Sequence, residues 1–430
     1  MSVLLPKVRV WFAILIISLA VCGWAAGKPG ANPDAVITLR GALALALEQN
    51  PELAAFSWDV RSAEAKILQA RLRPNPELGI QTEDIGGNKQ SRGLTRSQTT
   101  LQLSQIIELG GKRRSRVRAA KFGRELAELD YETKRLDVLR KTAQAFVDVL
   151  GAQRRVELAQ ENVNLAAGLL PDIQKRIEAG KASAVEKTRS DVAVASARIE
   201  ADQARRALIV ARQHLAAQWG GTEAHFLRVT GELDRIESLP SFGRLVLSLT
   251  NNPELARWAP ETERREAAVR LQLAEAVPNL TLLGGPRYLA ETDEVTNVIG
   301  FSLSLPFWNR NQGAILDARN QLAKAADERR SAVTRLSTEL SDAYQTVQRT
   351  ANEIRILKES VLPGAESAAQ ALQEGYQAGR YSYLEVNEAR RTLTAARLQY
   401  LQALTDYHKA IADIEALTAR PFENSSDFSK

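Results

Sequence analysis

The chain has 430 residues and a formal net charge of +6; 25% of its residues are charged and only 6% are aromatic. Lysine and arginine alternate with glutamate and aspartate along the chain and form no basic patch with stacking aromatic residues, so nucleic acid is excluded as a partner. The 25 glycines and 15 prolines fall in a few clusters, which indicates few elements, each of them long.

The N-terminus has the layout of a secretory signal peptide, which we assign to residues 1–27. Lys7 and Arg9 precede an uncharged run over 10–21, and small residues follow that run. It is shorter than the roughly 20 residues that a transmembrane helix needs, although a tail anchored in the inner membrane is an alternative. Cys22 lies where an exported chain could be lipidated, but Val21 immediately before it is a poor match to a lipoprotein processing site.

Cysteine and histidine usage excludes most catalytic and metal chemistry. Without Cys22, the mature chain would contain no thiol for a disulfide, a nucleophile or a thiolate metal site. The three histidines are scattered, and no His, Cys or Met cluster has the spacing of metal ligands. No residues suggest a catalytic triad, a phosphate-binding loop or paired catalytic carboxylates. We therefore expect no enzyme activity, no cofactor and no resident metal.

The chain repeats itself. The sequence Asn-Pro-Glu-Leu-Ala at 50–54 recurs at 252–256, and Ala-Gly-Lys at 179–181 recurs as Ala-Gly-Arg at 378–380. Solenoid repeats measure about 20–50 residues, so this much longer unit indicates duplication of a whole structural half. We infer the following divisions: a first repeat over 38–220, a linker over 221–240, a second repeat over 241–420 and a C-terminal tail over 421–430.

Each half is predicted to contain the same elements in the same order. In the first half these are a helix over 38–73, a strand pair within 77–109, a long helix over 112–179 and a returning helix over 182–218. In the second half they include a strand pair within 279–306, a long helix over 314–378 and a returning helix over 382–418. We expect Pro171 and Pro363 to kink the long helices. In the last helix Val386, Leu393 and Tyr407 belong to a heptad repeat that predicts coiled-coil packing.

The predicted strands have the pattern of membrane-spanning β-strands. Ile299, Phe301 and Leu303 alternate with Gly300 and Ser302, and each run is about 10 residues long, which suffices for a tilted strand to cross a bilayer. An ordinary soluble hairpin is the alternative. Four strands cannot close a barrel, and open edges are excluded from lipid, so the chain must oligomerise to form a closed wall. The expected fold class is mainly α with a small β part.

In its duplication and its order of strands, long helix, glycine and returning helix, the chain resembles the TolC family of outer-membrane factors over about 38–420. Two segments, 105–113 and 305–313, are similar to the CzcC branch, which serves heavy-metal efflux. The resemblance implies a homotrimer with a 12-stranded barrel in the outer membrane of a Gram-negative bacterium and a helical tunnel in the periplasm. It also implies two partners, a periplasmic adaptor and an inner-membrane RND pump.

The resemblance further implies a constriction at the periplasmic entrance of the tunnel. The positions that match it are Glu385, Glu388, Glu186 and Tyr376. Glu385 and Glu388 lie three residues apart and share a helix face, so three copies would form two stacked acidic rings that attract cations. Tyr381 stands where the family has a gate arginine. The positions that match the adaptor-docking tip are Gly180, Lys181, Gly379 and Arg380.

We therefore expect a passive conduit for divalent heavy-metal cations of the cobalt, zinc and cadmium type. The metal substrate rests on the resemblance to the CzcC branch, because the sequence contains no visible ligand cluster. One alternative is an outer-membrane channel for drugs or other small molecules. Another is a periplasmic adaptor, which would have a single helical hairpin and no duplication with strand pairs of spanning length.

Overall fold

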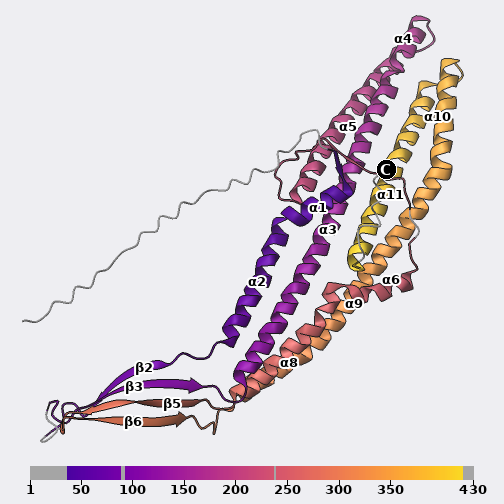
Figure 1. Cartoon of the computed structure of the whole chain (residues 1–430). Coiled ribbons are helices and arrows are strands. Elements are labelled where there is room, and N and C mark those ends of the chain that lie inside the picture. The colour runs from indigo at the N-terminus through magenta and orange to yellow at the C-terminus, as the bar shows by residue number, and fades with distance from the viewer. Residues whose placement is uncertain (1–35, 89–92, 237–238, 420–430) are drawn as a thin grey trace, which may run out of the picture.

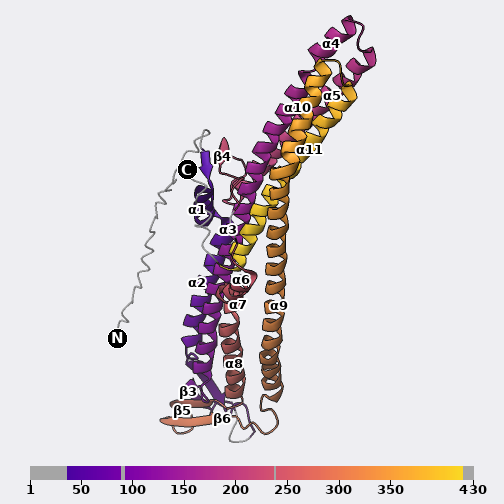
Figure 2. The same cartoon turned by 90° about the vertical axis from the view of Figure 1, so that its right-hand side faces the viewer.

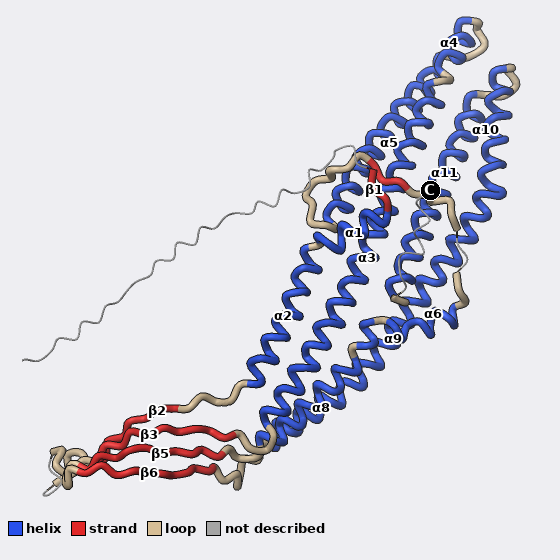
Figure 3. Tube along the Cα trace, viewed as in Figure 1, coloured by secondary structure: helices blue, strands red, loops and turns tan. Residues whose placement is uncertain are grey.

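The computed structural model describes residues 36–88, 93–236 and 239–419. The expected signal peptide at 1–27, Cys22 and the tail at 421–430 lie outside the described residues. The protein is elongated: a small sheet lies at one end, and long helices extend from it to tips at the other end (Figure 1). It is mainly helical with a small β part, which confirms the expected fold class (Figure 3).

One hairpin from each half contributes to a single antiparallel sheet. Its strand order is β2-β3-β5-β6, and β3 and β5 join the two hairpins. The strands are β2 (Glu77–Glu83), β3 (Gln98–Ile107), β5 (Leu280–Leu289) and β6 (Glu294–Leu303). β2 and β6 have a neighbour on one side only, so the sheet of a single chain has two open edges.

Strand β5 contains two glycines and a proline. It runs from Leu280 through Gly285 and Pro286 to Leu289 without a turn. A Cβ atom at Gly285 would collide with the carbonyl oxygen of Leu101 on β3. Glycine is therefore required here because two strand backbones approach closely, and it does not mark a turn.

The predicted helix over 38–73 is two helices, α1 (Leu39–Gln49) and α2 (Pro51–Arg71). Thr38 caps α1 through a hydrogen bond from the amide of Gly41 at 3.2 Å. Asn50 then caps α2, since its Oδ1 accepts from the amide of Leu53 at 2.9 Å. Pro51 occupies the first turn of α2, where its missing N–H costs nothing.

The repeated Asn-Pro-Glu-Leu-Ala sequence has the same role in both halves. In addition to capping α2, Asn50 donates from Nδ2 to the carbonyl of Gln218 at 2.7 Å. In the second half, Asn252 caps α7 (Pro253–Ala256) and donates to the carbonyl of Leu417 at 2.8 Å. Each asparagine therefore starts one helix and satisfies a free carbonyl at the end of another.

Both predicted long helices are interrupted near their prolines. The first consists of α3 (Lys112–Ala167) and α4 (Leu170–Glu178), and the second of α9 (Gln312–Ile356), a π-helical turn η3 (Leu357–Val361) and α10 (Leu362–Gln377). Pro171 and Pro363 lie in the first turns of α4 and α10. The returning helices are α5 (Ala184–Ala217) and α11 (Tyr383–Leu417), and the second half also contains α6 (Phe242–Ser248), the 3-10 turn η2 (Leu249–Asn251) and α8 (Trp258–Glu275).

A two-stranded sheet beside the helices was not predicted. β1 (Val36–Thr38) pairs in parallel with β4 (Arg228–Thr230), which lies within the predicted linker. The side-chain amide of Gln153 donates to the carbonyl of Val229 at 3.0 Å and accepts from its amide at 2.9 Å. Tyr400 donates to Asp234 at 2.7 Å. The linker residues around Val229 and Asp234 are therefore held against α3 and α11.

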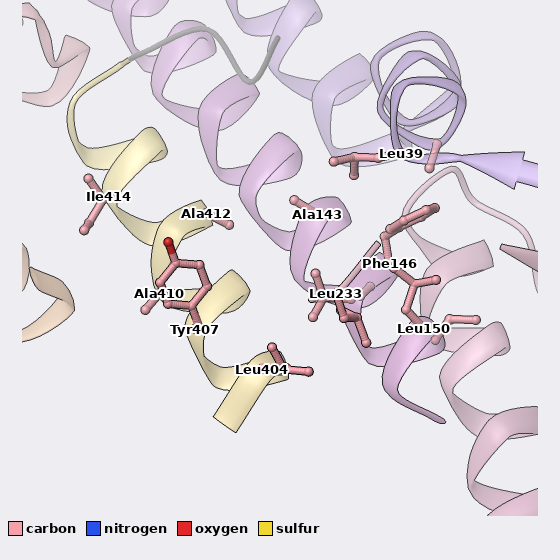
Figure 4. Packing of buried hydrophobic residues seen from close by; sticks show 14 of the residues in the cluster. Leu39, Ala143, Phe146, Leu150, Leu233, Leu404, Tyr407, Ala410, Ala412 and Ile414 are labelled. Carbon is pink, nitrogen blue, oxygen red and sulfur yellow. The ribbon is translucent and has the colours of Figure 1, made fainter. Parts of the chain in front are cut away.

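The main hydrophobic core lies where α3 and α11 meet α1 and the linker (Figure 4). Phe146 of α3 and Tyr407 of α11 are buried, and Leu39 and Leu233 join the same cluster. Tyr407 belongs to the predicted heptad, so the seven-residue pattern does define the buried face of α11. Truncating a buried Phe such as Phe146 to Ala typically costs about 3–5 kcal/mol.

Candidate functional site

The tips lie at the end of the molecule farthest from the sheet, where α4 meets α5 and α10 meets α11 (Figure 2). Gly180 and Gly379 have left-handed φ values of +69° and +80°, which favour glycine. In the first half Lys181 donates its amide to the carbonyl of Arg176 at 2.7 Å, and in the second Arg380 donates to that of Gly375 at 2.8 Å. The two turns thus have the same geometry.

Two basic residues follow the turn glycines. Lys181 and Arg380 are exposed, and a Cβ atom at Gly180 or Gly379 would meet no other atom within 4 Å. No hydrogen bond or ion pair joins either side chain to a described residue. The four residues expected at the docking tip therefore form a positively charged, solvent-exposed end.

The two acidic residues at the start of α11 differ in their contacts. Glu385 completes a capping box: its Oε2 accepts from the amide and from the hydroxyl of Ser382, both at 2.8 Å. These hydrogen bonds lower the pKa of Glu385. The bond from the backbone amide has the larger effect, and the bond from the hydroxyl has the smaller one. Glu388, one turn further along, is exposed.

Glu186 lies beside a buried tyrosine. Its Oε2 and the hydroxyl of Tyr376 are both buried, and neither completes a hydrogen bond with a described residue. Burial, above all, raises the pKa of Tyr376; the Glu186 carboxylate adds to this rise, and the positive charge of Arg176 opposes it. The structure therefore brings the buried Oε2 of Glu186 to the buried hydroxyl of Tyr376, whereas Glu385 and Glu388 are exposed.

Tyr376 is a core residue of the tips and does not line a surface. It is fully buried in a small cluster to which α4, α10 and α11 contribute. The other buried members are Leu169, Ile173, Tyr383 and Val386. A tyrosine in this position can connect the two hairpins of the chain, but it cannot contact a passing solute without rearrangement.

Arg176 provides the cation beside this cluster, and no pattern in the sequence indicated it. Its Nη1 donates to the carbonyl of Tyr376 at 2.6 Å, and its guanidinium carbon lies 4.3 Å from the centre of the Tyr376 ring. Gln377 forms a second link between the same helices through Asp172 at 3.1 Å. Tyr381, at the expected arginine position, instead packs its ring against Gly375.

Two arginines of α11, one heptad apart, connect the first hairpin to the second. Arg390 donates to the carbonyl of Leu165 at the end of α3 and to Gln373 of α10 at 3.1 Å. Its Nε is buried without a partner among the described residues, and burial lowers its pKa. Arg397 bridges Glu161 and Glu366 at 3.1 and 2.9 Å. The heptad spacing of the two arginines is the only sequence signal that marks them.

At the opposite end of the helices, the 105–113 segment joins the sheet to the bundle. Gly110 has a φ of +71°, and a Cβ atom there would lie 2.8 Å from the Cβ of Val277. Lys112 is 4% exposed; it donates to Asn279 at 2.6 Å and pairs with Glu275 at 3.4 Å. This turn of the first half is therefore packed against the C-terminal end of α8 from the second half.

The 305–313 segment contacts the same end of α8. Asn311 has a left-handed φ of +59° and donates to the carbonyl and the side chain of Gln272 at 2.9 and 2.8 Å. Both strand-to-helix turns are thus fixed on one helix end. In this chain the two segments that resemble the CzcC branch have a structural role at this junction.

None of the helices within 36–88, 93–236 and 239–419 has both the length and the hydropathy needed to cross a bilayer. Over the same ranges, no three His, Cys, Asp or Glu side chains are grouped so that they could hold a metal ion.

The chain belongs to the outer membrane efflux protein family, whose sequence profile matches residues 42–221 and 245–420. It is therefore an outer-membrane efflux protein of the TolC type. The assignment removes the alternative of a periplasmic adaptor.

Within this family the chain is 37% identical to the cobalt-zinc-cadmium resistance protein CzcC of Cupriavidus metallidurans, over 89% of this chain and 90% of that protein. It is 26% identical to the nickel-cobalt-cadmium resistance protein NccC of Alcaligenes xylosoxydans xylosoxydans, over 69% and 66% of the two chains. Among solved structures, one of CusC superposes with a TM-score of 0.75 over 88% of this chain and 91% of that chain, at 17% identity. These similarities confirm the expected family and its CzcC branch.

Proposed function

We propose that the protein is one subunit of a homotrimeric channel, a passive conduit across the periplasm and outer membrane without catalytic activity of its own. The observation that carries this proposal is the four-stranded sheet with open edges at β2 and β6. In lipid, each unpaired backbone group costs several kcal/mol, so the edges must pair with other copies. Three chains with four strands each would close a 12-stranded barrel, from which the helices would extend as a tunnel.

The cargo that we propose is a divalent heavy-metal cation. Support comes from the similarity to CzcC and NccC, whose names give cobalt, zinc, cadmium and nickel resistance. A conduit needs no tight metal site, because a tightly held ion would leave slowly; wall carboxylates that attract cations weakly are sufficient. Energy and selection would come from an inner-membrane RND pump and a periplasmic adaptor.

At the tips we propose that Glu385 and Glu388 surround the entrance and attract cations. Both are exposed at the start of α11, and Glu385 is oriented by its capping box. Glu186 and Tyr376 would hold the two hairpins together behind this constriction. The exposed turns at Gly180, Lys181, Gly379 and Arg380 would contact the adaptor, and their positive charge favours an acidic partner surface.

Growth of a deletion strain tests this function. The strain would be compared with a complemented strain on zinc, cobalt, cadmium, nickel and copper and on several drugs. We expect sensitivity to divalent metals only, with full recovery on complementation. Sensitivity to drugs alone would reject the metal cargo but keep the conduit. A strain that grows normally on every compound would contradict an efflux function under these conditions.

A further inference from the structure

This inference rests on the proposed channel and concerns the wall of its membrane-spanning part. In an antiparallel sheet, directly paired residues have their side chains on the same face. The register pairs Ile80 with Leu101 and Leu282 with Phe301, which defines an apolar face. This face contains no charged residue, and its side chains are strongly exposed in the single chain; Ile299, for example, is 90% exposed. It fits the lipid side of a barrel wall.

All the charged residues of the four strands lie on the opposite face. They are Glu77 and Glu83 of β2, Arg287 of β5 and Glu294 of β6. Glutamine, threonine, serine and glycine occupy most of the positions between them. Three carboxylates and one guanidinium give this polar face a net charge of −2 per chain, and a closed wall of three chains would carry three times as much.

The single positive charge on the polar face is fixed in place. Arg287 donates from Nε to Thr100 at 2.9 Å and from Nη1 to Gln98 at 3.2 Å. Its Nη2 lies 3.6 Å from Oε2 of Glu83, which neutralises it. In contrast, neither Glu77 nor Glu294 forms an ion pair with a described residue. The uncompensated charges therefore lie at the two ends of the sheet, with Glu294 at the end far from the helices (Figure 1).

We propose that the polar face of the sheet is a second cation-selective section of the conduit, separate from the tips. Glu294 would supply the negative charge that attracts cations at the outer mouth. Arg287, held in place by Glu83, would weaken this attraction. Such a ring raises the local concentration of hydrated cations, including divalent ones, without binding them tightly. The conduit would thus favour cations at its outer mouth as well as at its periplasmic entrance.

Thiol labelling of intact cells tests this proposal. Thr296 faces Arg287 in the register and lies on the polar face, whereas its neighbour Asn297 lies on the apolar face. Cys22 is the only native cysteine, so the parent chain gives the labelling background. Thr296→Cys and Asn297→Cys would be treated with membrane-impermeant methanethiosulfonates, one cationic and one anionic. Each rate would be divided by the rate of the same reagent with a free thiol in solution.

We expect Thr296→Cys to react, with a rate ratio that favours the cationic reagent, and Asn297→Cys to stay unlabelled. Adding Glu294→Gln should lower this ratio about twofold, and adding Arg287→Gln should raise it about twofold. Because the two changes act in opposite directions, partial loss of folded protein cannot produce both effects. Glu232→Gln, in the linker, is the matched control and should leave the ratio unchanged.

The outcomes separate this inference from the proposed function. A Thr296→Cys chain that reacts equally with both reagents, whatever stands at 287 and 294, would overturn the charge filter and leave the channel intact. Labelling of Asn297→Cys in place of Thr296→Cys would also overturn it, because the two faces would be reversed. No labelling at either position, with the chain present in the outer membrane, would contradict the channel itself.

Discussion

Glu186 and Glu385 occupy equivalent positions in the two halves, 199 residues apart, but their carboxylates have different surroundings. Glu385 accepts two hydrogen bonds from Ser382 at the start of its own helix. The Oε2 of Glu186 is instead buried beside the hydroxyl of Tyr376. The duplication therefore supplies one acidic residue that orders a helix start and one that lies against the other hairpin.

The capping box predicts a pH dependence at the second tip. The folded-state pKa of Glu385 is lowered from 4.5, so the stabilisation is complete above about pH 4.5 and is lost as the pH falls through the folded value. We expect hydrogen exchange at residues 383–386 to be faster in Glu385→Gln than in the wild type near neutral pH, and the difference to vanish in acid. Glu388→Gln, the control, should show no such difference. Equal exchange in all three chains near neutral pH would contradict the role of the cap.

Arg176 should matter more than the Tyr376 hydroxyl for holding the tips together. Arg176 contacts the carbonyl and the ring of Tyr376, and both remain in Tyr376→Phe. We expect Arg176→Gln to increase the conductance of reconstituted channels severalfold, and Tyr376→Phe to leave it close to the wild-type value. The reverse order, with Tyr376→Phe more open than Arg176→Gln, would show that the hydroxyl makes the decisive contact.

Two neighbouring glycines at the sheet–helix junction allow the cost of backbone strain and the cost of overpacking to be measured separately. Gly110 and Gly111 both have positive φ, but only at Gly110 would a Cβ atom meet Val277. Gly111→Ala should cost about 1–2 kcal/mol through the left-handed conformation alone. Gly110→Ala should cost about 1–3 kcal/mol more, through overpacking. Thermal unfolding of the purified protein in detergent measures both, and equal losses would disprove the packing contact.

The two arginines of α11 should differ in their contribution to stability. Arg390→Met removes the hydrogen bonds that the guanidinium donates to Leu165 and Gln373, and hydrogen bonds of a charged group contribute about 1.5–3 kcal/mol. Arg397→Met breaks ion pairs that are half exposed, and such pairs contribute about 0–1 kcal/mol. Thermal unfolding should therefore rank Arg390→Met as clearly less stable. The opposite ranking would place the main link between the hairpins at Arg397.

Elements with a local periodic signal were predictable from the sequence. The strand alternation and the heptad at Val386, Leu393 and Tyr407 depend only on neighbouring residues, and the structure confirms both. The division of the 38–73 helix was also visible in principle, because Asn50 followed by Pro51 is a helix-start signal. The continuation of β5 through Gly285 was not, since it depends on the approach of Leu101 from another strand.

The contacts at the tips could not be derived from local patterns. Arg176 and Tyr376 are 200 residues apart, and nothing beside either residue indicates their partner. Arg390 likewise donates to the carbonyl of Leu165, which lies in the last turn of α3. This carbonyl is available because α3 ends before Pro171. The roles of Glu385 and Glu388 at a constriction concern the proposed trimer and stay predictions.

Planar-bilayer recording on the purified mature chain tests the central claim, a passive trimeric conduit, most directly. The account predicts that the chain alone, without a pump, an adaptor or an energy source, gives discrete conductance steps. It also predicts a reversal potential in a salt gradient that indicates cation preference. Folded protein of trimer mass that inserts into the bilayer but gives no conductance, either as wild type or as Arg176→Gln, would contradict it.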